Sequence, residues 1–181
     1  MNPRDHVAST NVDCNGVFFP LQSIQRELDS QGIDIAGGSH GVYAVCEALD
    51  HPNHPRELLG GRHLLMVDDD ESLMRMIAWG LYASGASIST ATSGHKAIEA
   101  VAQTQFDLII MDACMPEIDG FETTSQLRRN GYSGPIVMFT GYFNLEDIER
   151  AMVAGCQVYA NKCIGAYHLL GIAHYLCKGI K

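Results

Sequence analysis

Four short segments, mostly apolar, each lead into a side chain that can bind phosphate or a metal ion. These segments, with the residues that follow them, are 64–67 before Asp68, Asp69 and Asp70, 108–111 before Asp112, 136–139 before Thr140, and 158–161 before Lys162. Runs of this kind are typical of strands buried on both faces, as in a parallel sheet covered by helices. In such a sheet the ligand crevice lies outside the carboxyl ends of the strands. We therefore expect the carboxylates, the hydroxyl and the ammonium at one rim.

At such a rim the carboxylates of Asp68, Asp69 and Asp112 would repel one another, because nearby like charges disfavour the ionised form. A divalent cation relieves this repulsion, and Mg²⁺ prefers oxygen ligands while keeping several waters. With its charge offset, one aspartate can attack a phosphoryl group as a nucleophile. Thr140 and Lys162 carry the groups that would hold the oxygens of the resulting acyl phosphate. The spacing thus predicts Mg²⁺-dependent phosphoryl chemistry.

Residues 62–181 are expected to form one domain of five strand-plus-helix units. The expected strands are 63–67, 87–91, 106–111, 136–140 and 157–160, and the expected helices are 71–83, one opened by Ser93 or Gly94, 121–129, 145–154 and 165–178. Regular alternation of strands and helices predicts an α/β doubly wound sheet. Asp70 and Asp119 are expected to cap the helices that follow them.

Residues 1–61 have a different character and are expected to form an N-terminal extension of unknown role. They are rich in Asn, Asp, Gly, His and Pro, including a run of breaking residues at 50–55. Two amphipathic stretches, 21–28 and 42–49, are predicted as short helices. A segment of this size buries little core by itself. It is therefore expected to pack on the main domain or to be partly flexible.

Composition excludes several classes of function. The chain has 181 residues, 46% of them hydrophobic and 18% charged, which is ordinary for a soluble globular protein. A net charge of −9 argues against nucleic-acid binding, which needs clustered Lys and Arg. No apolar run reaches the roughly 18–20 residues that cross a bilayer, and the N-terminus lacks the apolar stretch of a signal peptide. A cytoplasmic protein with six reduced cysteines is expected.

The segment 111–120, Met-Asp-Ala-Cys-Met-Pro-Glu-Ile-Asp-Gly, has the form D-x-x-M-P-x-x-D-G around Asp112. Together with the paired aspartates after the first strand, the threonine after the fourth and the lysine after the fifth, it resembles the receiver domain of two-component response regulators, as in the chemotaxis regulator. The resemblance covers about two-thirds of the chain, from His63 onward. It implies a flavodoxin-like fold whose five parallel strands lie in the order 2-1-3-4-5.

The resemblance also implies roles for the acidic residues of the rim. Asp112 would be the phosphoacceptor. Asp69 would bind Mg²⁺ directly and Asp68 mostly through water, while Asp112 and the backbone carbonyl of Cys114 would complete the protein ligands. These assignments make Mg²⁺ the expected cofactor.

A switch is implied by the same resemblance. Thr140 and Tyr159 would form the switch pair, in which the hydroxyl moves toward the phosphate and the aromatic ring rotates inward. Lys162 would bind a phosphate oxygen. The pair would couple the site to the face built from the fourth helix, the fifth strand and the fifth helix. A homodimer through this face stays open.

Two residues depart from the family pattern. Cys163 follows Lys162 where the family usually has proline, often after a cis peptide bond, which is essentially a proline phenomenon. A trans bond is therefore expected, and displacement of the lysine's loop stays open. Gly141 replaces the more usual alanine after Thr140 and adds backbone freedom next to the switch. Neither change removes a reacting group, but both would weaken activation.

Two further side chains are expected to tune dephosphorylation. In receivers, the side chains two positions after the phosphoacceptor and two after the threonine flank the attacking water. Here they are Cys114 and Tyr142, and neither orients water strongly. Tyr142 would also cover the phosphate. Slow self-dephosphorylation is therefore predicted. Oxidant sensing by Cys114 and Cys163 is a weaker alternative to plain packing, because no feature of the sequence lowers their pKa.

The favoured hypothesis is a Mg²⁺-dependent phosphorylation switch that receives its phosphoryl group from a histidine kinase or phosphotransfer protein and acts on a downstream protein partner. It would be no enzyme beyond catalysing its own phosphorylation and dephosphorylation. Because the sequence ends at Lys181, just past the last predicted helix, a DNA-binding module is not expected. Membrane insertion is not expected either, because no apolar run is long enough. One rival is a receiver-fold interaction module that works without phosphate. A phosphohydrolase is a weaker rival, because such enzymes commonly need a second aspartate where Cys114 stands.

Overall fold

The structure is a computed structural model, and it describes residues 10–12, 17–20, 58–142 and 144–178. Its strands are β1 (Thr10–Val12), β2 (Val17–Pro20), β3 (His63–Val67), β4 (Ser87–Ala91), β5 (Leu108–Met111), β6 (Ile136–Thr140) and β7 (Val158–Asn161). Its helices are α3 (Glu71–Tyr82), α4 (Gly94–Gln103), α5 (Gly120–Arg129), α6 (Leu145–Ala154) and α7 (Gly165–Lys178), with a 3₁₀ turn, η3 (Lys162–Ile164), before α7.

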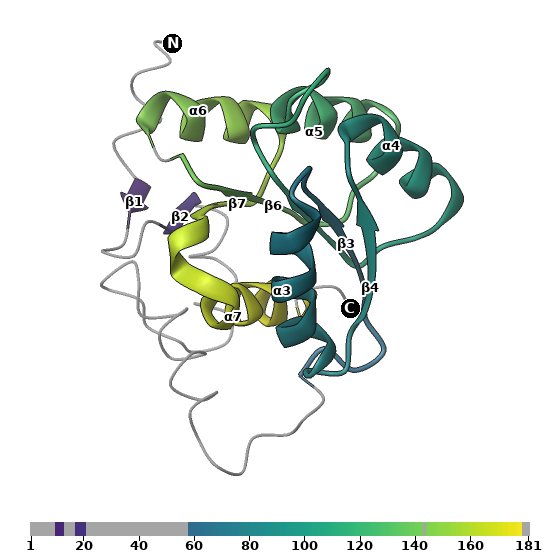
Figure 1. Cartoon of the computed structure of the whole chain (residues 1–181). Helices are drawn as coiled ribbons and strands as arrows, with labels where there is room; N and C mark the ends of the chain where they lie inside the picture. Colours follow the sequence, from purple (N-terminus) through teal and green to yellow (C-terminus); the bar gives the residue numbers. More distant parts are fainter. Residues whose placement is uncertain (1–9, 13–16, 21–57, 143, 179–181) are drawn as a thin grey trace.

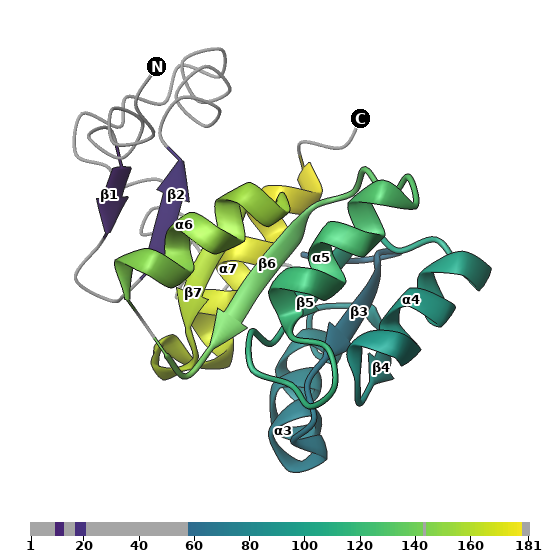
Figure 2. The ribbon, with the colours of Figure 1, turned by 90° about the horizontal axis from the view of Figure 1, so that it is seen from above.

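All seven strands belong to one sheet, in the order β1-β2-β7-β6-β5-β3-β4 (Figures 1 and 2). The strands β3 to β7 pair in parallel. Counted from β3, their order is 2-1-3-4-5, which confirms the predicted doubly wound fold. Helices α4, α5 and α6 cover one face of this parallel part, and α3 and α7 cover the other (Figure 1). The carboxyl ends of the parallel strands consequently open at one rim.

Two hydrophobic cores fill the spaces between the sheet and its helices. Successive side chains of a strand point to opposite faces, so Leu64 and Met66 pack toward α3 and α7 while Leu65 and Val67 pack toward α4, α5 and α6. All four are at most 1% exposed. Burial on both faces explains why the strand sequences are continuously apolar rather than alternating.

The helices begin where the sequence predicts. Asp70 caps α3 by accepting hydrogen bonds from the amides of Ser72 and Leu73. Asp119 caps α5 through the amide of Glu122 at 2.8 Å. Each cap satisfies amides that have no partner within the helix. Both predicted caps are confirmed, and they begin the helices that follow two strands of the rim.

The N-terminal segment contributes two strands that the sequence analysis does not predict. β2 pairs antiparallel with β7, with Val17 opposite Ala160 and Phe18 opposite Tyr159, and β1 pairs antiparallel with β2. The stretches 21–28 and 42–49, predicted as helices, lie outside the described residues. Among the described residues, no helix has the length and apolar character needed to cross a membrane.

The residues just before β3 also belong to the packed structure. Leu59 is fully buried in the core beside α3 and α7. Its amide donates to the carbonyl oxygen of Ser84 at 2.9 Å, and Nδ1 of His174 lies 2.9 Å from the carbonyl oxygen of Leu58. The chain that enters β3 is therefore held against α7.

Arg128, at the end of α5, binds the loops at the amino ends of the strands. Its Nε and Nη2 donate to the carbonyl oxygen of Gly155 at 3.0 and 2.8 Å. Its Nη1 donates to the carbonyl oxygens of Tyr132 and Gly134, both at 2.7 Å, and Nη2 also reaches Gln157 at 3.0 Å. The fork geometry of guanidinium lets one side chain satisfy several carbonyl oxygens.

We expect Arg128→Lys to lower the free energy of unfolding by about 2 kcal/mol, because one ammonium cannot reach three backbone carbonyls in different directions. The midpoint of thermal unfolding should fall by roughly 4–8 °C. Arg129→Lys is the matched control, since Arg129 is exposed and forms an ion pair with Glu122 on the surface of the same helix. Equal stability of the two variants would contradict this account.

Candidate functional site

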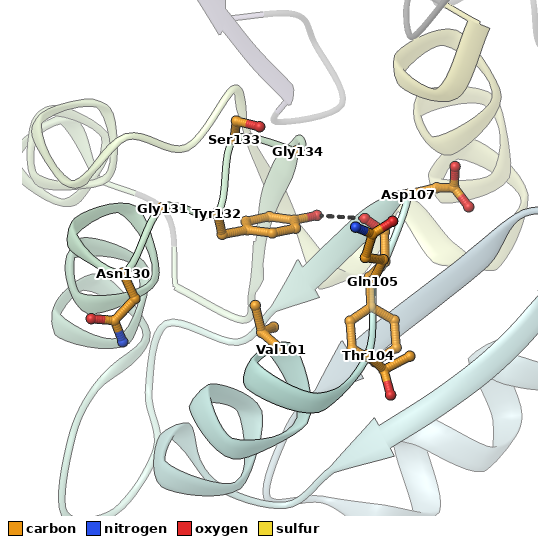
Figure 3. A pocket seen from close by; sticks show the side chains of 10 residues that line it. Val101, Thr104, Gln105, Asp107, Asn130, Gly131, Tyr132, Ser133 and Gly134 are labelled. Atoms are coloured by element: carbon orange, nitrogen blue, oxygen red, sulfur yellow. Dashed lines mark hydrogen bonds between the residues drawn. The ribbon is translucent and has the colours of Figure 1, made fainter.

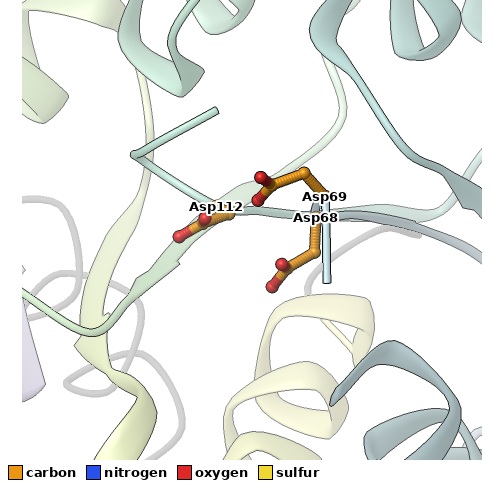
Figure 4. A group of neighbouring side chains, drawn as sticks. All are labelled: Asp68, Asp69 and Asp112. Carbon is orange, nitrogen blue, oxygen red and sulfur yellow. The ribbon is translucent and has the colours of Figure 1, made fainter. Parts of the chain in front are cut away.

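The carboxylates predicted from the sequence lie together at the carboxyl ends of β3 and β5. Asp68 and Asp69 follow β3, Asp112 follows β5, and one ligand oxygen from each lies within 4.8 Å of the others (Figure 4). Asp68 and Asp112 are 2% and 5% exposed, whereas Asp69 is exposed. The group thus has two buried carboxylates and one that faces solvent.

Lys162, which follows β7, bridges the two buried carboxylates. Its Nζ lies 2.7 Å from Asp68 Oδ2 and 3.1 Å from Asp112 Oδ1. Asp68 Oδ1 accepts a further hydrogen bond from the amide of Asp70 at 2.9 Å. The ion pair with Asp112 lacks good hydrogen-bond alignment, and Oδ1 of Asp112 is a buried oxygen without a hydrogen-bond partner. This oxygen is available to a group that enters the rim.

The charges of the rim shift the pKa of its members. Burial raises the pKa of the Asp112 carboxyl, the nearby Asp68 charge raises it further, and the Lys162 ammonium opposes both. Burial alone would lower the pKa of Lys162, but its hydrogen bond to Asp68 and the charges of Asp112 and Asp68 outweigh burial and raise it. Lys162 is thus held in its charged form, whereas burial and the charge of Asp68 make ionisation of Asp112 less favourable.

These residues fit a hard divalent cation. Three carboxylates converge, one of them solvent-facing, and a single ammonium offsets only part of their charge. The unpartnered Oδ1 of Asp112 is the kind of oxygen that such an ion binds. The donor set consists of oxygens, which suits Mg²⁺ better than a softer metal. The role predicted for the carbonyl of Cys114 stays a prediction.

Thr140 and Tyr159, the predicted switch pair, are both buried. Thr140 ends β6 and is fully buried, and its Oγ1 accepts a hydrogen bond from the amide of Tyr142 at 3.3 Å. Tyr159, on β7, is also fully buried, and its phenol donates to the carbonyl oxygen of Tyr142 at 2.8 Å. The ring of Tyr159 therefore occupies the inward position, and the side chain of Tyr142 is 67% exposed.

Cys114 lies at the edge of the rim with its side chain exposed. Burial and the negative charge of Asp112 raise the pKa of its thiol, while a hydrogen bond with the Thr140 side chain opposes them. A raised pKa keeps the thiol protonated and poorly nucleophilic. The raised pKa argues against oxidant sensing by Cys114, while its exposed side chain does not support the prediction that it is packed.

The loop after β5 is shaped by a close approach of its own backbone. At Gly120 a Cβ atom would overlap the carbonyl oxygen of Asp112, so only glycine fits there. The amide of Gly120 donates to the carbonyl oxygen of Ala113 at 2.9 Å. The neighbouring Asp119 accepts from Arg150 of α6 at 3.0 Å. This glycine of the sequence motif thus folds the loop back beside the rim.

The replacement of proline by Cys163 does not displace the lysine. No cis peptide bond occurs among the described residues, as expected for this bond. The amide of Cys163, which proline would lack, donates to Oδ1 of Asn161 at 2.8 Å. Asn161 was missed by the sequence analysis, although asparagine side chains commonly bond the backbone two residues onward. The turn therefore directs Lys162 into the rim without proline.

A second hollow lies at the opposite end of the sheet and does not belong to the site. It encloses about 650 Å³ between the end of α4 and the loop 130–134 (Figure 3). Across it, the phenol of Tyr132 donates to the carbonyl oxygen of Phe106 at 3.2 Å. Its one carboxylate, Asp107, is already paired with Arg62 at 2.8 Å. No cluster of reactive groups faces this hollow.

Residues 64–174 match the family model of the response regulator receiver domain. The chain belongs to this family. The match includes every residue predicted for the site, from Asp68 to Lys162, and excludes the N-terminal strands β1 and β2. The chain thus contains a response regulator receiver domain of the kind found in two-component systems, which confirms the resemblance drawn from the sequence. The family membership does not itself test the role of each residue.

Relatives and solved structures agree with this family. The heme response regulator HssR of Staphylococcus haemolyticus is 36% identical over 106 residues, covering 59% of this chain and 47% of HssR. The regulatory protein PhoP of Bacillus subtilis is 33% identical over 100 residues, covering 55% of this chain and 40% of PhoP. The chemotaxis protein CheY4 of Vibrio cholerae superposes with a TM-score of 0.61 at 27% identity, covering 64% of this chain and 98% of CheY4. The chain spans less than half the length of HssR and PhoP.

Removing one charge from the rim should stabilise the protein. We expect Asp112→Asn to raise the free energy of unfolding at pH 7 without Mg²⁺, by about 1 kcal/mol, because two buried carboxylates then no longer repel each other. The pKa of Asp112 is raised in the folded state, so its carboxylate costs stability above that pKa and costs none once protonated. The difference between variant and wild type should therefore shrink as the pH falls through this pKa and vanish below the pKa of the unfolded state.

Asp107→Asn is the control, because this substitution should lower the free energy of unfolding rather than raise it. Burial alone would raise the pKa of Asp107, but hydrogen bonds from the His63 amide and Arg62 outweigh it and lower the pKa. Its carboxylate therefore stabilises the fold above the unfolded-state pKa, and this contribution is lost as the pH falls. Chemical denaturation from pH 3 to 8 measures both variants, and destabilisation by Asp112→Asn at pH 7 would contradict the charge account.

Proposed function

We propose that this chain is a Mg²⁺-dependent phosphorylation switch and that Asp112 accepts the phosphoryl group. The observation that carries the proposal is the contact of Lys162 with Asp68 and Asp112 at 2.7 and 3.1 Å, beside the solvent-facing carboxylate of Asp69. This arrangement supports Asp112 as the nucleophile, Asp69 as a metal-binding group and Lys162 as the cation that would hold phosphate. The donor would be a phosphohistidine of a histidine kinase or phosphotransfer protein, with the transfer taking place in the cytoplasm.

In the transfer, a carboxylate oxygen of Asp112 forms a bond to phosphorus while the bond from phosphorus to the histidine nitrogen breaks. The electron pair of that bond stays with the imidazole of the donor, which takes up a proton. Oδ1 of Asp112 makes no aligned hydrogen bond, but it lies 3.1 Å from the ammonium of Lys162, which would have to shift as the bond to phosphorus forms. Positioning and charge stabilisation account for most of the catalysis of phosphoryl transfer.

The neighbouring side chains stabilise the product. The ammonium of Lys162 would move from the carboxylate of Asp112 to a phosphoryl oxygen. A hydrogen bond between these two charged groups is stronger than one between neutral groups. Thr140 would turn its hydroxyl from its present position beside Cys114 to a second phosphoryl oxygen. Asp68 and Asp69 would hold Mg²⁺, which supplies positive charge that offsets the carboxylates and the phosphoryl oxygens.

The readout would pass through β6 and β7. Thr140 and Tyr159 lie on these adjacent strands, and both hydrogen-bond to the backbone of Tyr142. If the Thr140 hydroxyl moves toward the phosphate, it gives up its hydrogen bond with the Tyr142 amide. The loop that carries Tyr142 would then move, and with it the ring of Tyr159, whose phenol donates to the same residue. A protein partner that contacts α6, β7 or α7 can detect such a change. The names of several relatives describe transcriptional regulators, but output by this chain is proposed to pass through protein contact.

The rival, an interaction module that never uses phosphate, is not favoured. It would have no need of two buried carboxylates around a lysine, an arrangement that costs desolvation energy. A phosphohydrolase is disfavoured as well. Its acid/base position holds Cys114, whose thiol has a raised pKa and stays protonated. Catalysis beyond the chain's own phosphorylation and dephosphorylation is not proposed.

Phosphorylation by a small acyl phosphate, followed by intact-protein mass spectrometry, tests the acceptor. We expect wild type to gain one phosphoryl group with Mg²⁺ and none after chelation, and Asp112→Asn to gain none. Asp69→Asn should slow the reaction by at least about tenfold. Asp70→Asn is the matched control, because Asp70 caps α3 outside the carboxylate group and asparagine caps equally well. Equal labelling of Asp112→Asn and wild type would refute the assignment.

The lifetime of the acyl phosphate tests the residues that flank the attacking water. Neither Cys114 nor Tyr142 orients water strongly, so we predict slow self-dephosphorylation. Tyr142→Ala should shorten the half-life several-fold by opening the rim to water. Loss of the label after removal of the phosphodonor measures this. A half-life of seconds in wild type that the substitution leaves unchanged would show the prediction to be wrong.

A further inference from the structure

One arginine of α6 connects the loop that follows Asp112 to the first turn of α6, which lies beside α5 (Figure 1). Nη2 of Arg150 donates to Oδ2 of Asp119, at the end of that loop, at 3.0 Å. Nη1 donates to Oδ1 of Asp147, in the first turn of α6, at 3.2 Å. The guanidinium also lies over the ring of Phe121, with its Cζ 4.1 Å from the ring centroid. We call these contacts of Arg150 the α5–α6 bridge.

Each group that Arg150 contacts is itself held by a second interaction. Asp119 caps α5 with its other oxygen, which accepts from the amide of Glu122 at 2.8 Å. Phe121 is 7% exposed and belongs to the same core as the inner face of α6. Asp147 accepts from the side-chain amide of Asn144, the N-cap of α6, at 2.6 Å. An isolated exposed ion pair contributes little, but here one guanidinium joins two held carboxylates and a buried ring, which gives the bridge a defined geometry.

The bridge connects two segments that the proposed switch would move relative to each other. The end of the loop after β5 is anchored, because Gly120 packs directly against the carbonyl oxygen of Asp112. The loop after β6 carries Tyr142, whose amide donates to the Thr140 hydroxyl at 3.3 Å, and it reaches the α6 cap Asn144 two residues later. A Thr140 hydroxyl that turned to a phosphoryl oxygen would therefore shift the start of α6. The bridge ties that start to a loop that is held in place.

We propose that the α5–α6 bridge is a restraint on the phosphorylation switch, which stabilises the arrangement without phosphate and has to loosen when a phosphoryl group is bound. The inference rests on the proposed function of Asp112. A ligand shifts a two-state equilibrium only by its differential affinity for the two states, so a protein without the restraint binds a phosphoryl group more tightly. Arg150 is a positioning residue in this account, because it acts through α6 rather than on the phosphoryl group.

Two bridge variants that change the charge in opposite directions test the restraint. Arg150→Gln removes a positive charge, whereas Asp119→Asn removes a negative charge and leaves a side chain that caps α5 equally well. Charge alone would weaken the binding of beryllofluoride, an anionic mimic of the phosphoryl group, in the first variant and strengthen it in the second. Loss of the bridge predicts instead that both variants bind it about three- to fivefold more tightly than wild type. Titration with Mg²⁺ present, followed by amide NMR, measures the affinity.

A double variant and a matched control complete this experiment. Arg150→Gln combined with Asp119→Asn should bind no more tightly than Arg150→Gln alone, because the arginine of the bridge is already gone. Arg129→Gln is the control, since Arg129 is exposed and pairs with Glu122 on α5, and it should show no gain in affinity. Opposite changes in the two bridge variants would overturn the proposal and leave a plain effect of charge.

Hydrogen exchange without any phosphate mimic tests the restraint in the free protein. The amide of Asp147 donates to Oδ1 of Asn144 at 2.8 Å, and the amide of Ile148 donates to the carbonyl oxygen of Asn144 at 3.2 Å. Both amides should exchange at least about threefold faster in the two bridge variants, and at the wild-type rate in the control. If wild type binds beryllofluoride but both bridge variants keep wild-type exchange or wild-type affinity, this inference alone fails. A wild type that binds no beryllofluoride would refute the proposed function and the inference with it.

Discussion

The ammonium of Lys162 lies between two buried carboxylates that would otherwise repel each other, and the geometry of the rim depends on this contact. Its distances to Asp68 and Asp112 are 2.7 and 3.1 Å. A buried pair of like charges is tolerated only when a cation and hydrogen bonds compensate it. The carboxyl ends of β3, β5 and β7 therefore have to lie close enough together for Lys162 to contact both carboxylates. The compensation is partial, which leaves Oδ1 of Asp112 open to a further cation or a phosphoryl group.

The connections that follow these strands hold the groups in place by backbone contacts. Gly120 allows the loop after β5 to pass directly over the carbonyl oxygen of Asp112. After β7, Asn161 binds the amide of Cys163 and forms the turn that proline often forms in the family. Two different local arrangements thus position Asp112 and Lys162. A departure from the family motif therefore need not weaken the site, since the lysine still reaches both carboxylates.

Much of the parallel sheet and of the rim could be predicted from the sequence, because buried parallel strands are continuously apolar and end in polar residues. The caps Asp70 and Asp119 were also visible, since capping is a local property. The pairing of β2 with β7 was not, because it depends on a distant strand having a free edge rather than on the sequence of Val17–Pro20. The contacts of Arg128 with three backbone carbonyls in two loops were hidden as well, because backbone acceptors carry no sequence signal.

The central claim is that the rim is a Mg²⁺-dependent acceptor for a phosphoryl group at Asp112. Amide NMR of the full chain with beryllofluoride, a stable mimic of the acyl phosphate, tests it most directly. The account predicts binding that requires Mg²⁺, shifts the amides of Thr140 and Tyr159, and disappears in Asp112→Asn. A folded wild-type protein that binds Mg²⁺ but shows no shift with beryllofluoride would contradict the account and identify a receiver fold that works by contact alone.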